Sequence, residues 1–184
     1  MSKVWKEKIP NILTMLNMTL GIVVIFLLLY PCHLEHKLLA VFFIIAGGII
    51  DAIDGTIARR WNAVTNMGKQ LDSFADLITF GLAPIALVHA IGLTEQSIVV
   101  SVFCWIYPLA GAFRLARYNL GDFTDHFIGL PITAAGLILT SYCGIILIWD
   151  ELPLLVDLAP LTAGLLGILS LLMVSTFKIN RLSF

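Results

Sequence analysis

Four aspartates in the first half of the chain have the residue type and spacing of a metal site. Asp51 and Asp54 are three positions apart, and Asp72 and Asp76 are four positions apart. On a helix either spacing places both side chains on one face, so two helices can present four carboxylates to one point. Four close carboxylates repel one another unless they are protonated, matched by cations or filled with metal. Hard divalent ions such as Mg²⁺ or Mn²⁺, which prefer oxygen ligands, are the simplest solution.

The composition indicates what kind of element must carry these aspartates. Of the 184 residues, 59% are hydrophobic and 12% are charged, and the mean hydropathy is +0.98. A water-soluble domain of this size needs about twice that charged fraction, whereas a bundle solvated by lipid needs apolar side chains on its outside as well. We therefore expect an all-α integral membrane protein. The three scattered cysteines predict no disulfide framework, and no nucleic-acid partner is expected.

Six apolar stretches are long enough to cross a membrane, because a helix that spans roughly 30 Å of hydrocarbon needs about 20 residues. We predict a six-transmembrane-helix bundle that forms a single domain over residues 1–184. Residues 1–10, with Trp5 among lysines, are predicted to form a short interfacial helix at the headgroup level; a merely solvated basic end is the alternative. The predicted spans are residues 12–30, 38–58, 71–91, 97–113, 127–149 and 158–177.

The basic residues indicate how the bundle is oriented. With a cytoplasmic N-terminus, ten of the eleven lysines and arginines fall on the cytoplasmic side and Lys37 alone falls outside. Because cytoplasmic loops carry the excess of positive charge, we expect both termini and the aspartates at the cytoplasmic face of the cell membrane. The ten residues are Lys3, Lys6, Lys8, Arg59, Arg60, Lys69, Arg114, Arg117, Lys178 and Arg181.

The residues between the aspartates complete a longer pattern. It reads Asp-x2-Asp-Gly-x2-Ala-Arg-x8-Gly-x3-Asp-x3-Asp and fixes eight residues over 26 positions. This pattern resembles, at every position, the signature of the CDP-alcohol phosphotransferase family. Residues 9–14 also look like the family's entry to the first span, and residues 113–119 and 127–131 resemble its phosphatidylserine synthase branch. The eight signature residues are Asp51, Asp54, Gly55, Ala58, Arg59, Gly68, Asp72 and Asp76.

The resemblance implies a mechanism in which two divalent ions, Mg²⁺ or Mn²⁺, bind the diphosphate of a CDP-lipid. An acceptor hydroxyl then attacks the phosphorus attached to the lipid and expels CMP. Paired metal ions suit this reaction because negative charge develops on the non-bridging and leaving oxygens. Carried over by position, Asp51, Asp54 and Asp72 are ligands, and Asp76 is both a ligand and the base for the acceptor hydroxyl.

The same resemblance implies where the substrates bind. The expected substrates are CDP-diacylglycerol, or its ether analogue CDP-archaeol, and L-serine, with CMP as a product; a homodimer is also expected. Arg114 and Arg117 are expected to bind the serine carboxylate or a lipid phosphate, with anchoring to anionic headgroups as the alternative; Asn119 would orient the serine amino group. The residues expected to bind the nucleotide or CDP-lipid are Asn11, Thr14, Asp51, Asp54, Gly55, Ala58, Arg59, Gly68 and Asp72.

Two alternatives follow from the same residues. The first keeps the chemistry but uses another acceptor, glycerol 3-phosphate or inositol phosphate, which should demand a larger basic pocket. The second is an ion-coupled transporter, since buried carboxylates also mark ion pathways. Transport predicts polar residues that continue across the membrane, and residues 38–46 and 79–88 contain almost none.

Overall fold

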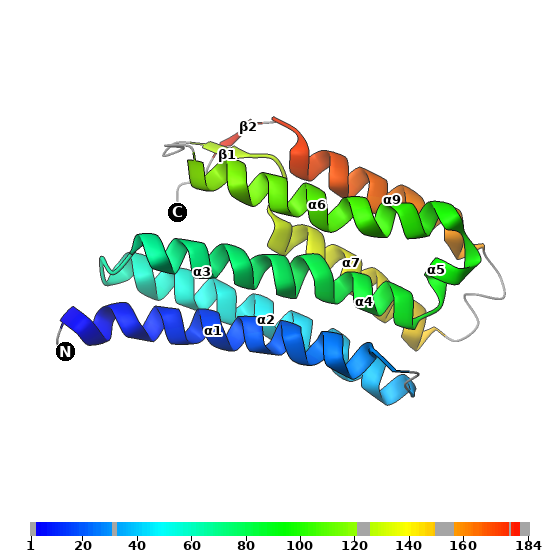
Figure 1. Ribbon diagram of the computed structural model, residues 1–184, viewed down its shortest axis with the longest axis horizontal. Coiled ribbons are helices and arrows are strands. Elements are labelled where there is room, and N and C mark those ends of the chain that lie inside the picture. Colours follow the sequence, from blue (N-terminus) through cyan, green and yellow to red (C-terminus); the bar gives the residue numbers. More distant parts are fainter. Residues whose placement is uncertain (1–2, 31–32, 121–125, 150–156, 177, 181–184) are drawn as a thin grey trace.

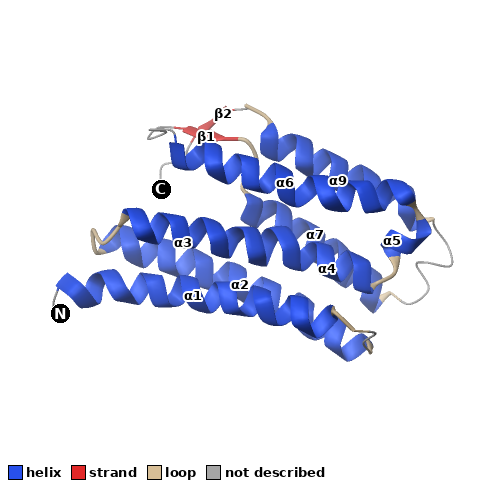
Figure 2. Cartoon of the chain, viewed as in Figure 1, coloured by secondary structure: helices blue, strands red, loops and turns tan. Residues whose placement is uncertain are grey.

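The protein is a bundle of helices that lie side by side along its long axis (Figures 1 and 2). The computed structural model describes residues 3–30, 33–120, 126–149, 157–176 and 178–180. The predicted all-helical membrane fold is confirmed, with the addition of two three-residue strands. The elements are α1 (Lys3–Leu28), α2 (Leu34–Arg60), α3 (Asn66–Asp76), the π-helical turn η1 (Leu77–Leu82), α4 (Ala83–Ala90), α5 (Leu93–Gln96), α6 (Ile98–Leu120), β1 (His126–Ile128), α7 (Ile132–Ile148), α9 (Leu158–Val174) and β2 (Lys178–Asn180).

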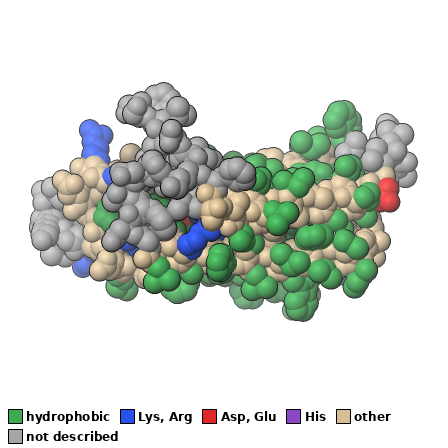
Figure 3. All heavy atoms as spheres, turned by 90° about the horizontal axis from the view of Figure 1, so that it is seen from above, with side chains coloured by type: hydrophobic (Ala, Val, Ile, Leu, Met, Phe, Trp, Pro, Cys, Tyr) green, Lys and Arg blue, Asp and Glu red, His purple; other side chains and the backbone are tan. Residues whose placement is uncertain are grey.

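The outer surface of the bundle is suited to lipid. Large apolar side chains point outward, among them Phe26, Trp105 and Leu171, which are 66%, 77% and 73% exposed. Hydrophobic side chains cover much of the face shown in Figure 3. Four continuous helical segments are long and apolar enough to cross a membrane, whereas α7 and α9 are apolar but only 17 residues long. The chain is therefore an integral membrane protein, and six crossings stay a prediction. The four segments are Lys8–Leu28, Leu34–Arg60, Asn66–Ala90 and Ile98–Leu120.

The helix ends differ from the predicted spans in three places. The predicted interfacial segment, from Lys3 onward, is continuous with α1, and Pro10 lies inside that helix. Helix α6 continues past residue 113 to Leu120. The fifth span was expected from residue 127, but residues 126–128 form β1, which pairs antiparallel with β2, and α7 begins at Ile132. Gly129 has a φ of +70° and Pro131 disfavours helical backbone in the residue before it, so the helix starts after both.

The turn between α2 and α3 brings the two aspartate pairs to the same end of the bundle. Helix α2 ends at Arg60, and the Thr65 hydroxyl accepts a hydrogen bond from the Gly68 N–H at 2.9 Å, which caps the start of α3. A cap of this type satisfies a backbone donor that has no partner within the helix. Because the connection is short, the end of α2 and the start of α3 are neighbours (Figure 1). We call this end of the molecule the aspartate end.

A π-helical turn follows Asp76 directly. Helices α1 and α7 approach η1 so closely that a Cβ on Gly21 would lie 2.6 Å from Thr79 Oγ1, and one on Gly136 would lie 2.7 Å from the Phe80 carbonyl oxygen. The Tyr107 hydroxyl of α6 donates to that same carbonyl at 3.1 Å. Single π-helical turns within α-helices are frequent at functional sites. Three helices therefore hold the backbone just beyond Asp76.

Candidate metal centre

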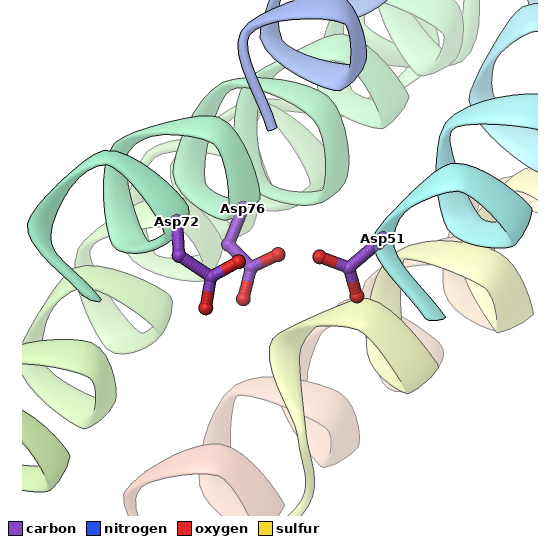
Figure 4. Close-up of side chains that lie close together, drawn as sticks. All are labelled: Asp51, Asp72 and Asp76. Carbon is purple, nitrogen blue, oxygen red and sulfur yellow. The ribbon is translucent and has the colours of Figure 1, made fainter. Parts of the chain in front are cut away.

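Three of the four aspartates meet at one point. One carboxylate oxygen from each of Asp51, Asp72 and Asp76 lies within 4.8 Å of the other two. Asp51 projects from α2 toward the other two carboxylates, which come from successive turns of α3 (Figure 4). Asp76 is 8% exposed, and Asp51 and Asp72 are half-buried. We call these three residues the aspartate trio.

The donor set of the aspartate trio fits a hard divalent cation. All the atoms that converge are carboxylate oxygens, which are the ligands that Mg²⁺ and Mn²⁺ prefer. Oδ1 of Asp76 is buried and has no hydrogen-bond partner in the part of the chain that the structure describes. A buried, unpartnered carboxylate oxygen costs stability, and a bound cation would relieve both this cost and the mutual repulsion of the trio.

Asp54, the fourth aspartate of the signature, makes its own contact with α1. It is buried, at 3% exposed, and its Oδ2 accepts a hydrogen bond of 2.7 Å from the Thr14 hydroxyl of α1. The Thr14 hydroxyl also lies 3.1 Å from the Pro10 carbonyl oxygen. Asp54 therefore contacts α1, while Asp51, one turn earlier on α2, contacts α3.

The residues expected to bind the nucleotide lie together at the aspartate end. A Cβ on Gly68 would be 3.0 Å from Asn11 Oδ1, so these two residues are in contact across α1 and α3. The Arg59 guanidinium folds back along α2, where a Cβ on Gly55 would be 3.3 Å from its Nη1. Ala58 is half-buried on α2, one turn beyond Asp54. Small residues at these positions leave space beside the carboxylates.

The three residues of α6 that were expected to bind the acceptor or a lipid phosphate have different surroundings. Arg114 is 7% exposed, and its Nε has no hydrogen-bond partner among the described residues. The Arg117 guanidinium instead donates to the carbonyl oxygens of Val174, Ser175 and Met173 at 2.8, 3.0 and 3.4 Å. Arg114 is therefore buried within the bundle, whereas Arg117 caps the end of α9. Asn119 Nδ2 donates to Ser73 Oγ of α3 at 2.9 Å.

One polar residue near the trio was missed by the sequence reasoning. Asn17 in α1 is fully buried, and neither its Nδ2 nor its Oδ1 has a hydrogen-bond partner. The available signal was an amide within a long apolar run, because polar groups inside membrane spans are costly and mark functional sites.

These features define a class: a helical membrane protein with a carboxylate metal site at one end of its bundle. The family model described as CDP-alcohol phosphatidyltransferase matches residues 7–177. The chain therefore belongs to that family of enzymes, as its aspartate signature predicted, and the transporter alternative is set aside. The family depends on divalent metal, and the aspartate trio supplies suitable ligands.

Three similar proteins share the name CDP-diacylglycerol–serine O-phosphatidyltransferase. The protein from Bacillus subtilis is 39% identical over 171 residues, which cover 92% of this chain and 88% of the relative. The protein from Methanocaldococcus jannaschii is 34% identical over 75% of this chain and 61% of its own length. The protein from Saccharomyces cerevisiae is 38% identical over 61% of this chain and 45% of its own length.

Proposed function

We propose that this protein transfers the phosphatidyl group of a CDP-diacylglycerol-type lipid to the hydroxyl of L-serine and releases CMP. The observation that carries the proposal is the aspartate trio in a member of this family. The names of the similar proteins from Bacillus subtilis and Methanocaldococcus jannaschii support serine as the acceptor. An ether-linked lipid such as CDP-archaeol is a second candidate donor.

The reaction makes one bond and breaks one bond at the phosphorus attached to the lipid. The serine hydroxyl oxygen bonds to this phosphorus, the bond from the phosphorus to the oxygen bridging to CMP breaks, and the hydroxyl proton passes to Asp76. A base must lie within hydrogen-bond reach of the proton that it accepts. Burial of Asp76 among the trio supports this role, because the carboxylate is shielded from bulk water.

Asp51, Asp54, Asp72 and Asp76 are the proposed ligands of two divalent ions, Mg²⁺ or Mn²⁺. When bound, such ions supply charge neutralisation at the diphosphate and fix the geometry of in-line attack. Asp54, which accepts a hydrogen bond from Thr14, is held near Asp51 by α1. Asn11, Thr14, Gly55, Ala58, Arg59 and Gly68 are proposed to line the nucleotide side of the site.

Arg114 is the proposed cation for the serine carboxylate. It is buried, and its Nε has no hydrogen-bond partner among the described residues. Asn119 of the same helix contacts Ser73 of α3, so this end of α6 lies beside the helix that carries Asp72 and Asp76. A guanidinium matches the two oxygens of a carboxylate. The contacts of Arg117 with the end of α9 favour an anchoring role for that residue, and Asn119 is held at Ser73.

An apolar groove between α2 and α7 is proposed to hold an acyl chain of the donor lipid. It has a volume of about 480 Å³ and is lined by Ile45, Gly48, Ala52, Thr56 and Leu137, among others. From Ile45 to Thr56 an α-helix rises about 17 Å, close to the roughly 15 Å of hydrocarbon in one leaflet. The groove runs alongside the turn of α2 that carries Asp51 and Asp54, so the headgroup and the chain would be bound by adjoining faces of one helix.

The sidedness of the enzyme is part of the proposal. Lys8, Arg59, Arg60 and Lys69 lie at the aspartate end, whereas Lys37 follows the start of α2 at the other end. The positive-inside rule therefore supports an active site and termini at the cytoplasmic face of the cell membrane, where serine and CMP are soluble. The side chains of Lys178 and Arg181 fall outside the described part of the chain. A homodimer is proposed from the family resemblance.

The test is the release of CMP by the purified protein in detergent or vesicles. CDP-diacylglycerol is offered with serine, glycerol 3-phosphate or inositol phosphate, each with Mg²⁺, with Mn²⁺ or with chelator. We expect CMP release with serine and metal only, and none from Asp76→Asn at any metal concentration. Faster CMP release with glycerol 3-phosphate or inositol phosphate would mean that this acceptor, and not serine, is the substrate. CMP release in the presence of chelator would contradict the metal-dependent mechanism.

A further inference from the structure

Asn17 is a fully buried amide with an unexplained side chain. It is 0% exposed, and neither Nδ2 nor Oδ1 has a hydrogen-bond partner within the described ranges of the chain. A buried polar group without partners destabilises the folded state. An unpaired amide in a native membrane helix therefore suggests a function that offsets this cost.

The neighbours of Asn17 place it beneath the aspartate trio. A Cβ on Gly47 of α2 would lie 2.7 Å from Asn17 Oδ1 and 2.8 Å from Thr79 Cγ2, and the Thr79 hydroxyl donates to the Asn17 carbonyl oxygen at 3.0 Å. Gly47 precedes Asp51 by four residues and Thr79 follows Asp76 by three. The Asn17 side chain thus lies between the two helices that carry the trio, one helical turn deeper in the bundle.

Oδ1 of Asp76 is a second buried atom without a hydrogen-bond partner among the described residues. Because Asp76 lies one helical turn before Thr79, the Asn17 amide and the Asp76 carboxylate can be joined by two hydrogen bonds in series through a water molecule. Buried waters bind to such otherwise unsatisfied polar groups. The amide can donate to a water through Nδ2, and that water can donate to the Asp76 carboxylate.

We propose that Asn17 is a positioning residue of the metal centre, which orients the Asp76 carboxylate through one ordered water. The proposal rests on the proposed function, and it adds a residue of α1 to a site otherwise built from α2 and α3. Gly47 belongs to the same arrangement, because any side chain at that position would displace the amide.

The test compares Asn17→Leu with Thr140→Val. Thr140 of α7 is a matched control, since it is also fully buried and its Oγ1 has no partner. Binding of Mn²⁺ to the purified protein is followed by the electron paramagnetic resonance of the free ion, together with kcat, the KM for serine and the Tm.

Loss of a residue that orients a metal ligand typically weakens metal binding or activity 10- to 100-fold. Asn17→Leu should therefore bind Mn²⁺ 10- to 100-fold more weakly and lose kcat to a similar degree, with the KM for serine within about twofold. Its Tm without metal should change little, because the amide makes no direct hydrogen bond to the described residues and leucine is of similar size. Thr140→Val should match the wild type in Mn²⁺ binding and kcat.

Wild-type Mn²⁺ affinity in Asn17→Leu would overturn the proposal, as would a lower Tm with unchanged Mn²⁺ affinity, which is the signature of a packing role. Gly47→Ala provides the same readouts if Asn17→Leu does not fold, and it should also weaken Mn²⁺ binding. The Mn²⁺ titration needs no substrate, so a wild type that binds Mn²⁺ but releases no CMP would refute the proposed function and leave this inference to be judged on binding alone.

Discussion

Arg114 and Arg117 lie one helical turn apart on α6, yet their guanidinium groups have different surroundings. Arg114 is buried within the bundle, and Arg117 donates to three carbonyl oxygens at the end of α9. The last carbonyls of a helix lack partners within the helix, and a cation at this end is also favoured by the helix dipole. Two arginines one turn apart can therefore have different roles: Arg114 is proposed to bind the acceptor, and Arg117 holds the end of α9.

Substitution of the two arginines should have different effects on the KM for serine and on the Tm. Arg114→Ala should raise the KM for serine about 10- to 100-fold, which corresponds to the roughly 1.5–3 kcal/mol of a hydrogen bond to a charged group. Arg117→Ala should leave that KM within about twofold and lower the Tm, because three carbonyls lose their donor. Serine titrations and thermal unfolding of both variants check this. A raised serine KM in Arg117→Ala alone would return that residue to the substrate site.

At the scale of elements, two adjacent glycines of α2 lie on different faces of the helix and contact different neighbours. Gly47 faces Asn17 and Thr79, whereas a Cβ on Gly48 would be 3.3 Å from both Cδ atoms of Leu137 on α7. Gly47 lets three helices meet beneath the trio, and Gly48 keeps open the groove between α2 and α7. A helix without side chains at these points allows the close approach on which small-residue packing in membranes depends.

A larger side chain at position 48 should fill that groove. Gly48→Leu is expected to lower activity about tenfold or more on CDP-diacylglycerol with long acyl chains, and to keep activity within about twofold on a dioctanoyl substrate, since the headgroup site is untouched. The measurement is CMP release with the two donors. Gly164→Leu is the matched control, because nothing lies within 4 Å of a Cβ at that position of α9. Equal losses on both donors would mean that the groove does not hold the chain.

At the scale of the whole molecule, the aspartate trio links the second and third long helices at one end of the bundle (Figures 1 and 4). Three close carboxylates repel one another when they are ionised and no cation is bound. A divalent ion that binds only the folded protein adds stability in proportion to the logarithm of its concentration. Metal binding and the stability of the bundle should therefore be coupled.

Addition of Mn²⁺ to the chelator-treated protein should raise its Tm. At a free concentration of about 100 times Kd, the expected gain in the free energy of unfolding is about 2.7 kcal/mol. Asp72→Asn, which removes one carboxylate from the trio, should show a smaller gain and less CMP release. Thermal unfolding in detergent with increasing Mn²⁺ measures both. An equal rise of Tm in the wild type and in Asp72→Asn would place the stabilising ion elsewhere.

The sequence alone determined what depends on local periodicity. Apolar stretches of membrane length predicted the helices, and spacings of three and four placed Asp51 with Asp54 and Asp72 with Asp76 on shared helix faces. Two consecutive spans, predicted over residues 38–58 and 71–91, run in opposite directions, which predicted that the two pairs lie at one end of the bundle. These inferences succeeded because helix geometry fixes the relation between residues a few positions apart.

Only the tertiary structure decided how each helix is rotated and what it contacts. The hydrogen bond from Thr14 to Asp54 joins residues 40 positions apart, and the one from Thr79 to Asn17 joins residues 62 positions apart. Such contacts depend on the packing of whole helix surfaces, including the π-helical turn after Asp76, and no local spacing encodes them. For this reason Asp54 contacts Thr14 of α1 while the aspartate trio meets between α2 and α3, Arg117 caps α9, and Asn17 contacts Gly47 and Thr79.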